Sequence, residues 1–266
     1  MRKKSPEASP QPDLRNRDFV ASLHKGLEVL TCFSRQASRL TLSEVARLTD
    51  SSPASARRSL HTLHALGYLH SDGKHFWMAP RALLVAHAYL SSRPTPPLAQ
   101  PLLDALAERT RQSASLGKLL EDDVIIIARS TARRSLSTGL GIGARLPAYC
   151  SALGQVLLAS LPEPEAERRV HTMPRPALTP QTVTDPDAVL ARVARCRSDG
   201  WAQSDGELEL GVRSLAVPVY ERGGAIVAGL SMSVRAERMG MVEFRDTFLP
   251  TLLKSQQTLR ERLYGE

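Results

Sequence analysis

Cysteine is scarce in this chain and has no spacing that indicates a metal or disulfide framework. Only three cysteines occur in 266 residues, Cys32, Cys150 and Cys196, and none belongs to a C-x-x-C pair. An odd number of distant thiols is typical of a reducing compartment and argues against a disulfide scaffold or a zinc ribbon. We therefore expect free thiols in a cytoplasmic protein.

Long apolar runs are also missing. No stretch approaches the ~18–20 apolar residues that a membrane-spanning helix needs. Residues 1–18 are basic and polar, without the apolar segment of a secretory signal. We predict no membrane association, and a disordered basic tail over residues 1–18.

Enzyme signatures are missing as well. The glycines of residues 139–143 are not spaced as G-x-G-x-x-G, and residues 145–147 would break the helix that a dinucleotide loop requires. Cys150 is not part of a G-x-S-x-G elbow. His61 and His64 lack a nearby third ligand for a metal site. We therefore expect no catalytic residue, no metal and no cofactor.

The length of the chain and its distribution of charge indicate two domains of different character. A chain of 266 residues exceeds a typical single domain. Residues 1–97 hold 14 Lys and Arg against 7 Asp and Glu, and residues 98–266 hold 21 against 20. The excess positive charge therefore lies in the amino-terminal part, where it would attract a phosphate backbone. Because basic tails can also act only as solubilising segments, charge alone leaves nucleic-acid binding open.

The strongest functional signal lies in residues 41–66, which predict two short helices and a tight turn. Thr41 and Glu44 form a T-x-x-E capping box at the start of the first helix. Ser52 and Pro53 begin the second helix with a capping hydroxyl and a proline at its first position. Apolar residues of the second helix recur at helical spacing, so its polar residues are left for solvent or a partner.

The surrounding residues complete a winged helix-turn-helix domain over residues 19–79. Residues 19–33 predict a first helix, and a D-G turn between the aromatic-rich runs 68–70 and 75–78 predicts a hairpin. In this arrangement one helix enters the DNA major groove. The residues expected to contact DNA are Thr41, Ser52, Ser55, Arg57, Arg58, His61 and Lys74.

Arg57 and Arg58 cannot both face the groove squarely. Neighbours on a helix point ~100° apart. One of the two arginines would read a base and the other would hold a phosphate, and the sequence leaves open which does which.

Beyond the hairpin, residues 80–97 predict a linker helix over 80–91 followed by a proline-rich hinge. Residues 98–266 alternate strand hairpins with helices, which is typical of an α+β domain built on an antiparallel sheet. The expected helices are residues 101–112, 151–161, 185–200 and 243–263, and the expected strands are 115–120, 124–129, 135–140, 215–220 and 225–234.

Several segments across residues 19–266 resemble the IclR family of bacterial transcriptional regulators. They are SLHKGLEVL at 22–30, LTLSEVARLTDSSPASARRSLHTLHALGYL at 40–69, FWMAPRALLV at 76–85, GARLPAYCSALGQVLLASL at 143–161 and SDGELELGVRSLAVPV at 204–219. The phrases RLPAYCSALG and ELELGVRSLAVPV resemble the Pca/Pob-type branch, which controls aromatic-acid breakdown through the β-ketoadipate pathway. The resemblance implies a profilin- or GAF-like effector domain, a dimer or tetramer, and a small organic acid as ligand.

The resemblance also implies where the effector binds, between the sheet and the helix that follows RLPAYCSALG. The implied effector residues are Thr138, Leu146, Tyr149, Ala152, Leu153, Ser204, Asp205, Val212 and Ser214. The apolar members of this set could equally belong to the core. Free backbone amides at the start of the helix at Ser151 would receive a carboxylate.

Three arginines, Arg129, Arg133 and Arg134, are left out of the predicted effector site. They could pair with the carboxylate of the effector. An exposed charge cluster on a hairpin is at least as good an interpretation.

The sequence thus predicts a ligand-responsive DNA-binding regulator, repressor or activator, of a catabolic operon. Its expected partners are double-stranded operator DNA, an aromatic or dicarboxylic acid, further copies of the chain and, for an activator, RNA polymerase; it would be nucleoid-associated when bound. The alternatives are a regulator with a glyoxylate- or pyruvate-like effector, an enzyme built on the carboxy-terminal domain, and an architectural DNA-binding protein. The missing catalytic groups argue against the enzyme, and the nearly neutral second domain argues against the architectural protein.

Overall fold

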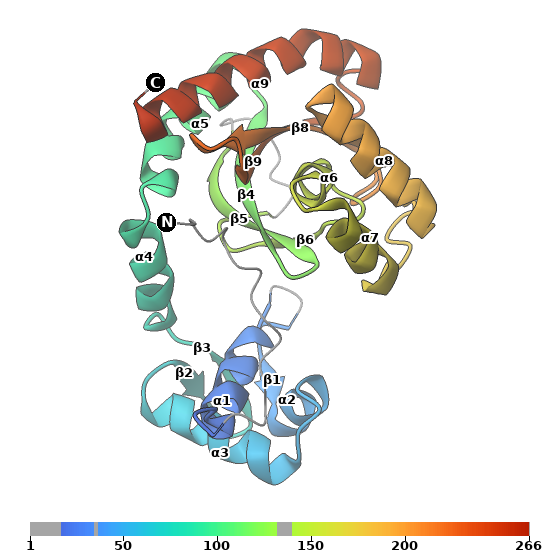
Figure 1. Cartoon of the computed structure of the whole chain (residues 1–266). Helices are drawn as coiled ribbons and strands as arrows, with labels where there is room; N and C mark the ends of the chain where they lie inside the picture. Colours follow the sequence, from blue (N-terminus) through green and yellow to red (C-terminus); the bar gives the residue numbers. More distant parts are fainter. Residues whose placement is uncertain (1–16, 35–36, 132–139, 266) are drawn as a thin grey trace. The chain divides into compact units, whose positions relative to one another are not determined.

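The computed structural model describes residues 17–34, 37–131 and 140–265 and divides into two compact units, Met1–Ser92 and Arg93–Glu266 (Figure 1). Residues 1–16 of the predicted tail and nearly all of the strand predicted at 135–140 lie outside the described residues. Within the described part, no helix is long and apolar enough to cross a membrane.

The smaller unit is a winged helix-turn-helix. Its helices are α1 (Ala21–Thr31), α2 (Leu42–Leu48) and α3 (Pro53–Ala65). Its antiparallel sheet has the order β1-β3-β2, with β1 (Leu40–Thr41), β2 (Leu69–Ser71) and β3 (His75–Met78). Apolar side chains of all three helices and of the sheet share one core, which includes Val29, Val45, Leu60, Leu69 and Phe76.

The helix α4 (Ala82–Ser92) follows the wing and has no buried residue. Leu83, Leu84 and Val85 are each more than 60% exposed, at 69%, 63% and 62%. An apolar helix with this exposure is typical of a surface that another molecule covers.

The next helix, α5 (Thr95–Thr110), begins six residues earlier than the predicted start at residue 101. The residues Pro96 and Pro97 lie in its first turn, where the N–H that proline lacks has no helical partner to lose. Most of the predicted proline-rich hinge is therefore helical, and only Arg93 and Pro94 separate α4 from α5.

The larger unit is built on a six-stranded antiparallel sheet of order β6-β5-β4-β9-β8-β7. This architecture confirms the predicted α+β fold around an antiparallel sheet. The strands are β4 (Ser113–Leu120), β5 (Asp123–Ser130), β6 (Arg145–Pro147), β7 (Ala202–Asp205), β8 (Val212–Tyr220) and β9 (Ile226–Arg235).

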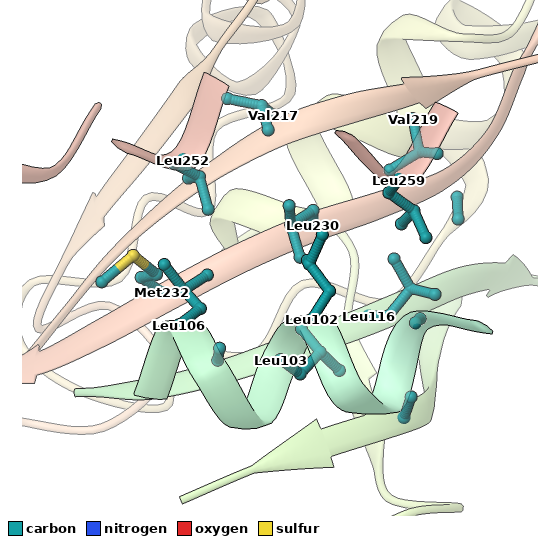
Figure 2. Close-up of a cluster of buried hydrophobic side chains, with 14 of the residues drawn as sticks. Leu102, Leu103, Leu106, Leu116, Val217, Val219, Leu230, Met232, Leu252 and Leu259 are labelled. Atoms are coloured by element: carbon teal, nitrogen blue, oxygen red, sulfur yellow. The ribbon is translucent and has the colours of Figure 1, made fainter. Parts of the chain in front are cut away.

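Helices cover both faces of this sheet. On one face lie α5 and α9 (Met241–Tyr264); Leu102, Leu103 and Leu106 of α5 pack against strand residues such as Leu230 and Met232 (Figure 2). The other face carries α6 (Ala152–Ala159), with α7 (Glu163–Thr172) and α8 (Pro186–Asp199) outside it.

Three elements of the larger unit were not predicted from the sequence: β6, β7 and α7. Residues 145–147, expected only to interrupt a helix, form β6 at the edge of the sheet, where a proline is tolerated. The helix α7 buries only Ala166 and Val170, so its sequence shows almost no apolar stripe.

Candidate functional site

The helix α3 presents the arginines expected to contact DNA. Its first turn is capped by the hydroxyl of Ser52, which accepts the backbone N–H of Ser55 at 3.3 Å, and Pro53 occupies the first helical position. The inward face carries Ala56, Leu60 and Leu63. Because these residues face the core, the opposite side of the helix faces solvent. Arg57, Arg58 and His61 are exposed.

Ser55 was expected to face solvent or a partner, and this expectation is wrong. The residue is only 7% exposed. It lies beside Ala56 on the inward face of α3, so its hydroxyl is not on the surface that carries Arg57 and Arg58.

Thr41 has two structural roles. Its hydroxyl accepts the backbone N–H of Glu44, and the carboxylate of Glu44 accepts the backbone N–H of Thr41 at 2.7 Å, which confirms the predicted capping box. The backbone of Thr41 also pairs with His75 across β1 and β3. Thr41 therefore joins the start of α2 to the wing.

The tip of the wing is a tight turn with Lys74 exposed at its end. The carboxylate of Asp72 accepts the backbone N–H groups of Lys74 at 3.0 Å and His75 at 2.7 Å. These hydrogen bonds lower the pKa of Asp72 to about 2. Gly73 adopts a φ of +93°, which a side chain would oppose.

Arg39, which was not among the residues expected to contact DNA, is a further exposed basic residue beside the strand β3. Its guanidinium lies 4.2 Å from the centre of the Trp77 ring and its side chain is 60% exposed. The ring of His61 meets Phe76 edge-on, at 6.1 Å between centroids. Both contacts join distant parts of the chain, so no local pattern reveals them.

The larger unit contains a cavity of about 60 Å³ between the sheet and the start of α6. Its apolar lining is Ile126, Leu140, Leu146, Ala152, Leu153, Leu208 and Val212, and its polar lining is Ser115, Arg129, Ser151, Ser204, Glu209, Ser214, Ser231 and Ser233.

The structure brings most of the predicted effector residues to this cavity. The six that line it are Leu146, Ala152, Leu153, Ser204, Val212 and Ser214. Thr138 lies outside the described residues, as do Arg133 and Arg134.

Tyr149 and Asp205 do not line the cavity. The side chain of Tyr149 is buried in the core beneath α6, and its hydroxyl donates to the carbonyl of Pro176. Burial also raises the pKa of Tyr149 well above its ordinary value. Asp205 follows Ser204 on β7, so it points to the other side of the strand, where it pairs with Arg213 at 2.9 Å.

Arg129, which was left out of the predicted effector residues, lines the cavity and is partly buried. It lies on β5, directly across from Ser115 of β4, and donates to the hydroxyl of Ser115 at 2.6 Å. Burial lowers the pKa of Arg129, although arginine stays protonated at any physiological pH. A cation is therefore held at the wall of the cavity.

Serine hydroxyls form a polar stripe across the same sheet face. In the strand register, Ser214 stands opposite Ser204 on one side and Ser233 on the other, and Ser231 stands opposite Ser115. A buried sheet face normally carries apolar residues, because each buried hydroxyl needs a hydrogen-bond partner. Polar residues alternating with apolar ones at Ser231-Met232-Ser233 were a sequence signal for this stripe.

The start of α6 also faces the cavity. Ser151 caps the helix by accepting the backbone N–H of Gly154 at 3.0 Å. Ser151, Ala152 and Leu153 all line the cavity. The amino end of a helix favours an anion, so it adds to the positive potential of Arg129.

Family models match both units. The IclR helix-turn-helix domain matches residues 22–73, and the bacterial transcriptional regulator IclR C-terminal domain matches residues 87–260.

Individual relatives match over nearly the whole chain. The Pca regulon regulatory protein of Pseudomonas putida is 37% identical over 98% of this chain and 90% of its own length. The structure of a transcriptional regulator from Rhodococcus sp. RHA1 is 38% identical, with a TM-score of 0.77 over 92% of this chain and 98% of that one. The inducer-binding domain of the PobR transcription factor from Acinetobacter, a double mutant in complex with 3-hydroxybenzoic acid, is 31% identical, with a TM-score of 0.59 over 62% of this chain and 97% of that one.

Proposed function

The chain belongs to the IclR family of bacterial transcriptional regulators, and we propose that it controls an aromatic-acid catabolic operon in response to a small aromatic acid. It is a DNA-binding regulator rather than an enzyme, as the missing catalytic motifs predicted. The observation that carries the proposal is the serine stripe with Arg129 at the wall of a cavity whose remaining lining is mostly apolar, and whose one carboxylate, that of Glu209, pairs with Arg235.

An aromatic hydroxy acid suits the chemistry of this cavity. Side chains such as Leu146, Leu153 and Val212 supply an apolar wall for a ring. The serine hydroxyls can donate to or accept from ring hydroxyls. Arg129 and the amino end of α6 favour a carboxylate. The homologous PobR domain is described in complex with 3-hydroxybenzoic acid, which supports the same ligand class here.

The size of the cavity has a consequence for binding. Its volume of about 60 Å³ is smaller than the ~150 Å³ of a cavity that holds benzene. A ring would therefore bind only as lining side chains move outward. This movement couples occupancy of the cavity to the conformation of the effector unit.

Thermal unfolding of the full chain with single acids tests the effector proposal. The panel contains 4-hydroxybenzoate, protocatechuate, β-ketoadipate, pyruvate and glyoxylate. A ligand at a hundred times its Kd stabilises by about 2.7 kcal/mol, which raises Tm by several degrees. We expect a shift with an aromatic acid, and loss of that shift in Arg129→Gln.

Arg145→Gln is the matched control, because Arg145 is on β6 and pairs with Asp123 at 2.6 Å outside the cavity lining. A shift that survives in Arg129→Gln would refute the role of Arg129. A shift with pyruvate or glyoxylate alone would replace the aromatic-acid proposal with a different carboxylate pathway.

For DNA, we propose contacts from α3 and the wing. Arg57, Arg58 and His61 lie on the exposed face of α3, Ser52 at its start, and Lys74 at the tip of the wing. The hydroxyl of Thr41 already donates to the carboxylate of Glu44 and accepts the backbone N–H of Glu44. Thr41 would therefore contact a phosphate only if its hydroxyl gave up the hydrogen bond to that carboxylate. The cation–π contact on Trp77 places Arg39 as a further candidate for phosphate binding.

Titration with the DNA adjacent to its own gene at several salt concentrations tests these contacts. Loss of a phosphate contact reduces the slope of log K against log salt by about 0.9, whereas loss of a base contact costs ~1–3 kcal/mol for the preferred sequence only. Arg57→Ala and Arg58→Ala should therefore separate the two roles. Arg238→Ala removes the same charge from an exposed loop of the larger unit and should leave binding unchanged. Unchanged binding by both α3 variants would overturn the interface.

We also propose that the protein acts in the cytoplasm as a homodimer or tetramer, on the nucleoid when bound to DNA. The exposed leucines of α4, together with Leu23 and Leu27 of α1 at 62% and 54% exposure, support an association surface. Analytical ultracentrifugation of the wild type and of Leu83→Glu tests it. A monomeric wild type would refute the proposal. If the protein is an activator, it would also contact RNA polymerase.

A further inference from the structure

A second cavity, of about 250 Å³, lies among α6, α8 and the edge strand β7. Its lining includes Gln155 of α6, Arg192 and Arg195 of α8, and Glu207 of the loop after β7. It shares none of its lining residues with the serine-lined cavity. Because Ser204 lines the first cavity and Asp205 the second, the strand β7 forms a wall of both.

Two polar side chains of this lining each carry one buried atom that no other protein group in the described residues pairs. Gln155 and Glu207 are only 3% and 4% exposed. Within the described residues, neither Nε2 of Gln155 nor Oε2 of Glu207 has a hydrogen-bond partner. Native proteins pair nearly all such atoms, because burial without a partner costs free energy. A ligand in this cavity that displaced the atoms covering Nε2 of Gln155 and Oε2 of Glu207 would supply the missing acceptor and donor.

The carboxylate of Glu207 is held firmly in this position. Its other oxygen, Oε1, accepts from Nη1 of Arg192 at 2.6 Å. The hydroxyls of Thr179 and Thr182 donate to the backbone carbonyls of Gly206 and Glu207, both at 2.7 Å. The loop is thus fixed from two sides, and Oε2 cannot turn toward solvent without breaking these bonds.

The charges around the cavity balance. The cations Arg192 and Arg195 stand against Asp199, Asp205 and Glu207, and Asp205 is paired with Arg213. A ligand with net charge would upset this balance, whereas a zwitterion would not. Trp201 and Cys196 add an apolar part to the lining.

We propose that this cavity is a second ligand site and that it takes a small zwitterionic amino acid. The ammonium group would donate to Oε2 of Glu207. The carboxylate would accept from Nε2 of Gln155 and be neutralised by Arg195, whose exposed guanidinium forms no ion pair with any residue in the described ranges. The side chain of the amino acid would pack against Trp201.

Isothermal titration calorimetry of the full chain with each of the twenty L-amino acids tests the proposal, with glycerol and myo-inositol as uncharged probes. We expect saturable binding of at least one amino acid at one site per chain. This binding should persist when the first cavity is saturated with 4-hydroxybenzoate. It should weaken at least tenfold in Glu207→Gln, which removes the charge but keeps the shape.

Glu237→Gln is the matched control, because Glu237 is exposed and lines neither cavity. Since Glu207→Gln also removes the ion pair with Arg192, circular dichroism must show that it folds. If it does not fold, Gln155→Met decides, since it removes the amide at similar volume and leaves the ion pair of Glu207 with Arg192 in place. Absence of binding, binding of the polyols alone, or equal binding in the variants would overturn the proposal.

Discussion

Gly154 provides a sharp test of how α6 packs. A Cβ at this position would lie 2.0 Å from the carbonyl oxygen and 2.3 Å from the Cα of Ala148, far inside van der Waals contact. Both atoms are backbone, so neither can move aside as a side-chain end would. Gly154→Ala should therefore push α6 away from the segment that precedes it.

The magnitude follows from two opposing terms. Replacing glycine by alanine inside a helix normally stabilises by ~1 kcal/mol. Overpacking of a core costs ~1–3 kcal/mol, sometimes more. Because the clash is with rigid backbone, the upper end applies, and we expect a net loss of about 2 kcal/mol, or about 4–8 °C in Tm for a unit of this size.

Gly26→Ala in α1 is the matched control, since nothing lies within 4 Å of its Cβ position. The same substitution there should stabilise the smaller unit by up to about 1 kcal/mol. Differential scanning calorimetry measures both variants, and hydrogen exchange of peptides from each unit assigns the transitions. A Gly154→Ala protein at least as stable as the wild type would refute the packing described for α6.

Three further predictions concern single hydrogen-bonding groups. Tyr149→Phe should lower the free energy of unfolding by ~1–3 kcal/mol in urea denaturation, because it leaves the carbonyl of Pro176 without its donor; an unchanged midpoint would contradict this contact. Ser52→Ala should destabilise the smaller unit by ~0.5–2 kcal/mol, whereas Ser52→Asp should retain the cap. Asp72 has a pKa of about 2 against an ordinary 3.8, so its stabilisation of the wing should be complete above pH 4 and fade as the pH falls through 2. The protection factor of the His75 amide, its exchange rate relative to an unprotected amide at the same pH, should fall with this titration and lose the dependence in Asp72→Asn; a protection factor that stays constant from pH 5 to pH 2 would oppose the turn described.

The elements predicted well from the sequence are those with local signals. The capping box at Thr41 and the Ser52-Pro53 start of α3 depend on residues within one helical turn. Both were therefore predicted at the residues where the structure has them. Ser55 was expected to be exposed because it is polar and lies close to Arg57 and Arg58 in the sequence. Its position is nevertheless on the inward face of α3, where it is buried.

The serine-lined cavity shows why the lining of a site is only partly predictable from sequence. Leu146 and Ser204, which family resemblance implied for the effector site, line this cavity, and so does Arg129, which was left out of that set. Its position depends on pairing with Ser115, fourteen residues away, and on the approach of β9 from far along the chain. Strand register and the choice of sheet face are tertiary properties, which local spacing does not specify.

Because of its two structural roles, Thr41 couples local unfolding of the wing to local unfolding of α2. Its backbone belongs to the ladder with β3, and its side chain closes the first turn of α2. Fraying of the wing at His75 would therefore remove a tether from the start of α2, and loss of the cap would loosen the edge of the wing. Regions joined in this way exchange their amide protons together, as one cooperative segment. At the DNA interface proposed above, a base sequence that deforms the duplex near the wing would then alter the start of α2 without any change in the contacts of α3.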